Sequence, residues 1–193
     1  MLRAMTLANQ ITLGRILLIP VFWWLSISYG RGFEAGNPLE WQRWMAIAVF
    51  VLAALSDGLD GYIARHRNQR SRFGSVLDPV ADKALLITAI LVLSFGGWEK
   101  SFPLWFPALV IGRDVVILGG CGVLYLFKGG LDVKPSWTGK AATAALMVAI
   151  TWTMLGLPHY LVSVHLAGIL SVLSGIDYLA RGLLGLRKND QID

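Results

Sequence analysis

The chain has 193 residues, of which 55% are hydrophobic and 15% charged, and its mean hydropathy is +0.60. Because soluble domains carry about 25% charged residues, this composition argues against an ordinary water-soluble protein. The net charge of +5 would suit nucleic acid, but the positions of the basic residues favour a membrane surface, so we expect no nucleic-acid partner.

Six apolar segments are each long enough to cross a bilayer as a helix of about 20 residues. We predict membrane helices at 11–29, 44–65, 74–96, 103–127, 141–157 and 159–184. Several of the connections are short and carry glycine, proline or polar residues, as turns do. The sequence therefore predicts an all-α integral membrane protein with six transmembrane helices, in which residues 1–193 form a single membrane domain.

The first segment resembles a secretory signal peptide in one respect, because Arg3 precedes an apolar stretch. Its start is polar, however, with Asn9, Thr12 and Arg15, and no clear small-residue cleavage site follows. We therefore expect a first helix that is retained.

Lysine and arginine are distributed unequally between the two sets of loops. With a cytoplasmic N-terminus, the outer side receives only Arg31, Arg43 and Lys100. Because basic residues favour the cytoplasmic side, we predict that both termini are cytoplasmic and that the basic loops contact anionic lipids. Four tryptophans fall near the outer boundary, as in an interfacial aromatic belt: Trp41, Trp44, Trp98 and Trp105.

Four aspartates lie where the second and third segments approach the cytoplasmic side. Asp57 and Asp60 are spaced i, i+3, and Asp78 and Asp82 are spaced i, i+4, so each pair lies on one helix face. Converging carboxylates repel one another and are costly in a membrane unless cations neutralise them. Hard oxygen ligands suit Mg²⁺, Mn²⁺ or Ca²⁺, so we predict a metal site for one or two ions.

The four aspartates could also serve in two different ways. They could form structural ion pairs with Arg65, Lys83 or Arg113. They could instead carry a divalent cation across the membrane, although all four lie toward one end of their helices and nothing polar continues to the opposite side.

The stretch from Asp57 to Asp82 resembles the signature of the CDP-alcohol phosphatidyltransferase family, D-x2-D-G-x2-A-R-x8-G-x3-D-x3-D. All eight positions are present: Asp57, Asp60, Gly61, Ala64, Arg65, Gly74, Asp78 and Asp82. The resemblance implies an enzyme that transfers a phosphatidyl group from CDP-diacylglycerol to an acceptor alcohol and releases CMP. It also implies a homodimer in a bacterial inner (plasma) membrane, with its active site facing the cytoplasm.

The match also implies a role for each signature residue. The four aspartates would hold two Mg²⁺ or Mn²⁺ ions, and Asp82 would also act as the general base. Gly61, Ala64 and Gly74 would accept the cytidine, and Arg65 would contact its phosphates. Further contacts with the CDP-lipid are implied for Ser71 and for the first-helix run N-x2-T-x2-R: Asn9, Thr12 and Arg15.

Three basic residues outside the signature are candidates for the acceptor site: Arg113, Lys140 and Arg181. Arg113 and Asp114 interrupt an apolar span, and a guanidinium can bind a phosphate through two N–H groups. Each candidate could instead have a structural role. Arg113 could pair with Asp177 or a signature aspartate, Lys140 could be a topology charge, and Asp177 could form a structural pair with Arg181.

The acceptor itself is indicated by two short stretches. The run PSWTGK is most similar to family members that use glycerol 3-phosphate, which predicts phosphatidylglycerophosphate as the product. The GRD triplet at 112–114 departs from their arginine followed by glutamate, and it resembles family members that make cardiolipin from phosphatidylglycerol. Cardiolipin synthesis is therefore the alternative.

Overall fold

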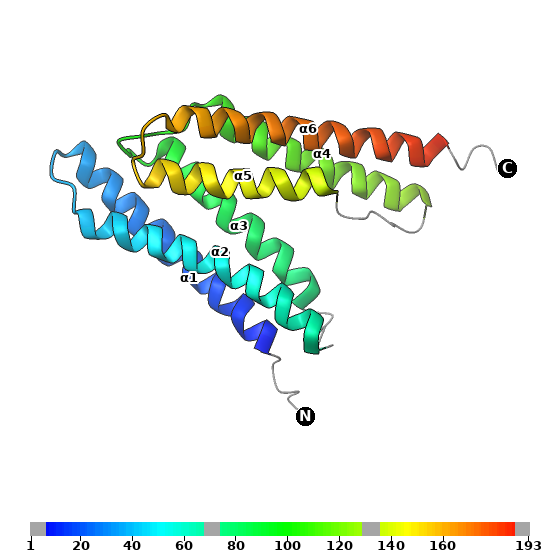
Figure 1. Ribbon diagram of the computed structural model, residues 1–193, viewed down its shortest axis with the longest axis horizontal. Coiled ribbons are helices and arrows are strands. Elements are labelled where there is room, and N and C mark those ends of the chain that lie inside the picture. The colour runs from blue at the N-terminus through cyan, green and yellow to red at the C-terminus, as the bar shows by residue number, and fades with distance from the viewer. Residues whose placement is uncertain (1–6, 68–73, 129–135, 188–193) are drawn as a thin grey trace. The chain divides into compact units, whose positions relative to one another are not determined.

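The computed structural model describes the backbone of residues 7–67, 74–128 and 136–187, and the side chains of residues 12–56, 80–120 and 136–181. Figure 1 shows the helices of this part of the chain: α1 Leu7–Glu34, α2 Glu40–Arg67, α3 Gly74–Phe95, α4 Trp105–Lys128, α5 Trp137–Met154 and α6 Tyr160–Arg187. The described backbone contains no strand, which confirms the all-α prediction.

The helices group into two compact units. The first comprises Met1–Ser101 with Ile150–Leu157, and the second comprises Phe102–Ala149 with Pro158–Asp193. In the first unit α1 packs against α2 and α3, and α2 also contacts α3. In the second unit α4 packs against α6, as Figure 1 shows. That the chain forms a single membrane domain stays a prediction.

Aromatic side chains occupy the core of the first unit. Phe22 of α1 and Phe50 of α2 are buried, with ring centroids 5.7 Å apart. Tyr29 lies against Trp98 at 4.7 Å, and the indole N–H of Trp98 donates a hydrogen bond of 3.0 Å to the carbonyl of Ser26. These contacts join the end of α1 to the segment that follows α3.

The tryptophans predicted to form an aromatic belt do not share one environment. Trp41, Trp44 and Trp105 are exposed, but Trp98 is buried. The prediction is therefore wrong for Trp98, whose indole N–H finds its partner inside the protein.

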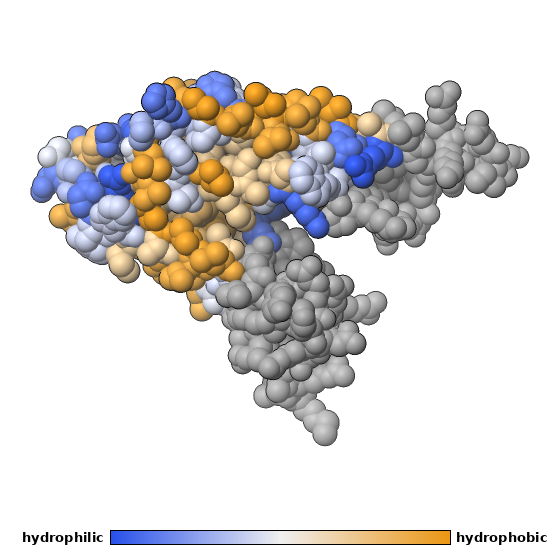
Figure 2. Space-filling model, viewed as in Figure 1, coloured by the Kyte–Doolittle hydropathy of each residue, from blue (hydrophilic) through white to orange (hydrophobic). Residues whose placement is uncertain are grey.

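Apolar side chains also cover much of the outer surface. Figure 2 shows them along α6, where Leu166, Ile169 and Leu173 are among the exposed residues. Among the residues whose side chains are described, two helical segments are long and apolar enough to cross a membrane: Thr12–Glu34 and Tyr160–Arg181. These features support a membrane protein, while the six spans and their orientation stay predictions.

The backbones of α1 and the end of α3 approach closely at two glycines. A Cβ atom placed on Gly30 would lie 1.6 Å from the carbonyl oxygen of Gly96, whereas ordinary van der Waals contact begins near 3.4 Å. This crossing therefore requires a residue without a side chain, as many close helix contacts do. A Cβ atom on Gly14 of the same helix would meet nothing within 4 Å.

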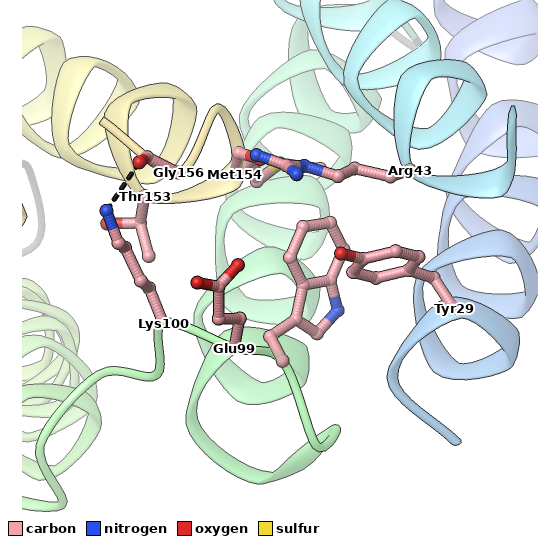
Figure 3. A pocket seen from close by; sticks show the side chains of 8 residues that line it. Tyr29, Arg43, Glu99, Lys100, Thr153, Met154 and Gly156 are labelled. Carbon is pink, nitrogen blue, oxygen red and sulfur yellow. Dashed lines mark hydrogen bonds between the residues drawn. The ribbon is translucent and has the colours of Figure 1, made fainter. Parts of the chain in front are cut away.

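The C-terminal end of α5 is bound by two basic side chains, which Figure 3 shows. Arg43 Nε donates a hydrogen bond of 2.9 Å to the carbonyl of Met154. Lys100 Nζ donates to the carbonyls of Gly156 and Leu157, the latter at 2.8 Å. Met154 is the last residue of α5, and the final carbonyls of a helix have no partner within it and carry its negative dipole end, so the Arg43 cation stabilises this end. Lys100 holds the turn that follows.

Backbone caps at glycines end two of the helices. Beyond α5, the N–H of Leu157 donates to the carbonyl of Trp152 at 3.2 Å around Gly156, whose φ is +67°. Gly36 follows α1 in the same conformation, with φ +74°. Glycine adopts this left-handed conformation without a Cβ clash, so each helix stops at its glycine.

Candidate functional site

Asp82 is the one signature aspartate whose side chain the structure describes. Its Oδ1 accepts a hydrogen bond from Nη1 of Arg15, and the two residues form an ion pair between α3 and α1. The Arg15 side chain is 1% exposed and that of Asp82 is 29% exposed. A buried guanidinium is tolerated only with a partner of opposite charge, so this pair fixes α1 beside the end of the signature.

The structure thus joins two residues for which the sequence predicts different roles. Arg15 is predicted to contact the CDP-lipid, and Asp82 is predicted to bind metal and accept a proton. Thr12 lies one turn before Arg15 on α1 and is also buried. Asn9 lies a further turn earlier, and its side chain is outside the described residues. The ligand contacts of these α1 residues stay predictions.

The remaining signature residues lie on two helices that contact each other, α2 and α3. The helical backbone confirms that Asp57 and Asp60 are one turn apart on α2, and that Asp78 and Asp82 are one turn apart on α3. The described backbone also includes Gly61, Ala64, Arg65 and Gly74, but the described side chains do not include these positions or the other three aspartates. Ser71 is outside the described residues.

The chemistry of this donor set fits a hard divalent cation. Two contacting helices each carry two carboxylates at adjacent turns, and carboxylate oxygens are the ligands that Mg²⁺ and Mn²⁺ prefer. The described Asp82 carboxylate is bound by Arg15 through Oδ1. The metal site itself stays a prediction.

Arg113 of α4 binds α6 in the second unit. Its Nη2 donates a hydrogen bond of 2.7 Å to Ser174 Oγ, and its Nη1 lies 3.4 Å from Asp114 Oδ1. The Arg113 side chain is 13% exposed, and within the described residues its Nε is buried without a hydrogen-bond partner. The alternative prediction that Arg113 pairs with Asp177 is wrong, because Asp177 binds other residues.

Two glycines lie beside the Arg113 side chain. A Cβ atom on Gly175 of α6 would lie 3.5 Å from Arg113 Cγ. A Cβ atom on Gly139 of α5 would lie 3.1 Å from Ser136 Oγ, 3.6 Å from Ser174 Oγ and 3.9 Å from Arg113 Nη2. The start of α5 therefore reaches the contact between α4 and α6.

Asp177 connects α6 to the start of α5. Its Oδ2 accepts a hydrogen bond of 2.6 Å from Thr138, and its Oδ1 accepts one of 2.8 Å from Arg181 Nε. The hydroxyls of Thr138 and Ser136 are 2.9 Å apart, and Ser136 Oγ accepts the N–H of Gly139 at 3.0 Å as the N-cap of α5. The predicted ion pair between Asp177 and Arg181 is confirmed.

We call this arrangement the α4–α5–α6 cluster, and its residues are Arg113, Ser136, Thr138, Ser174, Asp177 and Arg181. Lys140, the third predicted acceptor residue, is exposed on the first turn of α5. Ser136, Thr138 and Ser174 were not predicted from the sequence. The spacing of Ser174, Asp177 and Arg181 as i, i+3, i+7 is the signal that places them on one helix face.

Known proteins resemble this chain over most of its length. The profile of the CDP-alcohol phosphatidyltransferase family matches residues 5–176. The chain is 36% identical over 187 residues to a probable phosphatidylglycerophosphate synthase of Mycobacterium tuberculosis (strain ATCC 25618 / H37Rv), which covers 94% of this chain and 83% of that protein. It is 34% identical over 146 residues to the CDP-diacylglycerol–glycerol-3-phosphate 3-phosphatidyltransferase of Escherichia coli (strain K12), which covers 75% of this chain and 74% of that protein.

Proposed function

Because the chain belongs to the CDP-alcohol phosphatidyltransferase family, we propose that it transfers the phosphatidyl group of CDP-diacylglycerol to glycerol 3-phosphate. The products are phosphatidylglycerophosphate and CMP. Family membership makes the chain a phosphatidyltransferase, and the cation-transporter alternative is thereby set aside. The acceptor assignment is carried by one observation, the match over most of their length to relatives whose names specify this chemistry.

The α4–α5–α6 cluster supports an acceptor that carries a phosphate monoester. Arg113 is largely buried, and a buried cation suits an anionic ligand. Planar guanidinium groups bind phosphate oxygens through pairs of N–H donors. Glycerol 3-phosphate carries up to two negative charges on its phosphate, whereas the phosphodiester of phosphatidylglycerol carries one. We therefore assign Arg113, Lys140 and Arg181 to acceptor binding and prefer glycerol 3-phosphate to phosphatidylglycerol.

Asp82 is the proposed general base. It accepts the proton of the acceptor hydroxyl as the acceptor oxygen forms a bond to the lipid-side phosphorus of CDP-diacylglycerol. The bond between that phosphorus and the oxygen of CMP breaks, and CMP leaves with the electron pair. The ion pair with Arg15 orients the Asp82 carboxylate for this role. Eight residues are assigned to the CDP-lipid: Asn9, Thr12, Arg15, Gly61, Ala64, Arg65, Ser71 and Gly74.

The residues proposed to hold Mg²⁺ or Mn²⁺ are Asp57, Asp60, Asp78 and Asp82. Such ions, when bound, neutralise the phosphoryl oxygens and stabilise the departing nucleotide. We further propose a homodimer in the bacterial inner membrane, with this site facing the cytoplasm. That placement suits the reaction, because the nucleotide and glycerol 3-phosphate are water-soluble while the acyl chains stay in the bilayer.

The test is CMP release by the purified protein in detergent with CDP-diacylglycerol and Mg²⁺, offering glycerol 3-phosphate and phosphatidylglycerol in separate reactions. Removal of a general base costs about 10²–10⁴-fold in rate, so Asp82→Asn is expected to lose release. Glu40→Gln, which changes an exposed carboxylate at the start of α2, is the matched control and is expected to retain it.

Each outcome of this assay has a separate meaning. Release that requires glycerol 3-phosphate and is abolished by EDTA supports both the acceptor and the metal. Release with phosphatidylglycerol alone makes the chain a cardiolipin-forming enzyme. Release that persists in EDTA contradicts the metal assignment, and no release with either acceptor contradicts the proposed reaction.

A further inference from the structure

Arg181 is an exposed arginine whose guanidinium is bound through Nε alone within the described residues. Its side chain is 60% exposed, and Nε donates to Asp177 Oδ1 at 2.8 Å. Within the part of the chain that the structure describes, the two terminal nitrogens of Arg181 donate no hydrogen bond. A guanidinium carries five N–H donors in a fixed plane, so binding Nε orients the terminal donors without using them.

The contribution of this pair to stability is too small to explain its surroundings. An exposed i, i+4 pair on a helix contributes little to stability and needs no support from other elements. Here the second oxygen of Asp177 is bound by Thr138, which lies on a different helix. The carboxylate is therefore restrained on both oxygens, more than a surface ion pair requires.

Two hydroxyl groups connect Asp177 to the start of α5. A carboxylate only accepts hydrogen bonds, so the single Thr138 proton is donated to Asp177. The Ser136 and Thr138 hydroxyl oxygens lie 2.9 Å apart, so Ser136 supports Thr138 at the start of α5. Ser136 Oγ in turn accepts the backbone N–H of Gly139. The backbone at the start of α5 is thus connected to Asp177 through Ser136 and Thr138.

We propose that Asp177 is a positioning residue for the acceptor, held by Thr138 and Ser136, and that it orients the Arg181 guanidinium to bind a phosphate group. This inference rests on the proposed function, which assigns the phosphate of the acceptor to this cluster. Ser174, one turn earlier on α6, accepts a hydrogen bond of 2.7 Å from a terminal nitrogen of Arg113, Nη2. One face of α6 therefore orients two arginines before the ligand arrives.

Loss of this orientation is expected to weaken binding of the acceptor and to leave the chemical step in place, because the proposed role of Asp177 is exerted through Arg181. Asn in place of Asp177 keeps the shape but carries no charge, so the Arg181 guanidinium loses its hydrogen bond to a carboxylate, whereas the Asn amide can still donate to the Thr138 hydroxyl. Loss of a hydrogen bond to a charged group corresponds to about a tenfold or greater loss of affinity. We expect Asp177→Asn to raise KM for glycerol 3-phosphate by that factor, with kcat and KM for CDP-diacylglycerol unchanged.

Three threonine variants separate positioning from folding. Thr138→Val removes the hydroxyl at constant shape and is expected to resemble Asp177→Asn, whereas Thr138→Ser keeps the hydroxyl and is expected to restore wild-type KM. Thr143→Val is the matched control on α5, because the Thr143 hydroxyl donates to the Gly139 carbonyl within its own helix at 3.0 Å. It is expected to behave as wild type.

Two measurements are made on each full-length protein with Mg²⁺: CMP release, and binding of inorganic phosphate by calorimetry. Three results would overturn the inference. The first is an unchanged KM for glycerol 3-phosphate in Asp177→Asn, and the second is a KM in Thr138→Ser that is raised as much as in Thr138→Val. The third is a parallel loss of kcat and of the affinities for both substrates. CMP release by the wild-type protein with glycerol 3-phosphate tests the proposed function separately from the positioning role. If that release is absent, phosphate binding that weakens in Asp177→Asn still supports the positioning role, and binding that does not weaken refutes it.

Discussion

Replacing Gly30 with alanine is expected to separate two backbones that now touch. The added Cβ would lie 1.6 Å from the Gly96 carbonyl oxygen, and ordinary contact needs about 3.4 Å. The end of α1 must therefore move by about 1.8 Å relative to the end of α3. A shift of this size also breaks the 3.0 Å hydrogen bond from Trp98 to the Ser26 carbonyl, which lies one turn before Gly30 on α1.

The expected cost follows from these two contacts. Overpacking costs about 1–3 kcal/mol, and a lost buried hydrogen bond adds about 1 kcal/mol. Alanine regains up to about 1 kcal/mol through its higher helix propensity. The net destabilisation is therefore about 1–3 kcal/mol. For a chain of 150–250 residues this lowers the unfolding temperature by roughly 2–12 °C.

The assay is thermal unfolding in detergent, followed by the near-ultraviolet circular dichroism of the aromatic residues. Gly14→Ala is the matched control, because the same substitution on the same helix meets no atom within 4 Å and is expected to be neutral or stabilising. Gly30 is about 22 Å along the helix from Arg15, so CMP release below the transition is expected to be unchanged. Equal unfolding temperatures for the two variants would refute the assignment of a close backbone crossing.

Three further outcomes are expected. Gly156→Ala should lower the unfolding temperature more than Gly36→Ala. Both positions have a positive φ, but only a Cβ at position 156 would clash with Arg43, at 2.5 Å from Nη2. Thermal unfolding curves of the two variants, measured side by side, check this. Ser136→Ala removes the N-cap of α5 and should destabilise by about 1 kcal/mol in the same assay, a value near zero being the contrary result. Arg113→Lys replaces a planar fork with a single ammonium and should raise KM for glycerol 3-phosphate at least about tenfold, whereas an unchanged KM would remove Arg113 from the acceptor site.

The number and order of the helices could be predicted from the apolar segments, but their ends could not. The first segment loses its apolar character near residue 29, yet α1 continues through Arg31 to Glu34. Backbone hydrogen bonds persist through polar residues until the chain reaches Gly36, which adopts the left-handed conformation. The start of α5 at Trp137 is likewise set by the Ser136 cap, several residues before the apolar run begins.

The spacing of the signature aspartates was predictable because it is local to each helix. The partner of Asp82 was not predictable. The sequence offers four basic residues as possible partners and does not distinguish among them: Arg15, Arg65, Lys83 and Arg113. Arg15 is 67 residues away in the chain, and the packing of α1 against α3 decides the pairing. The partners of Asp177 depend in the same way on where α5 begins.

The binding of the α5 end by Arg43 and Lys100 has a consequence for synthesis of the protein. The first unit is discontinuous in the chain, because residues 102–149 separate Ser101 from Ile150. Closing a loop of that length costs about 3 kcal/mol of chain entropy. While the ribosome is still making α4, the carbonyls that Arg43 and Lys100 bind do not yet exist. The unit that contains the N-terminus therefore cannot be completed until Leu157 has been synthesised, and its last interactions form only after most of the chain has emerged.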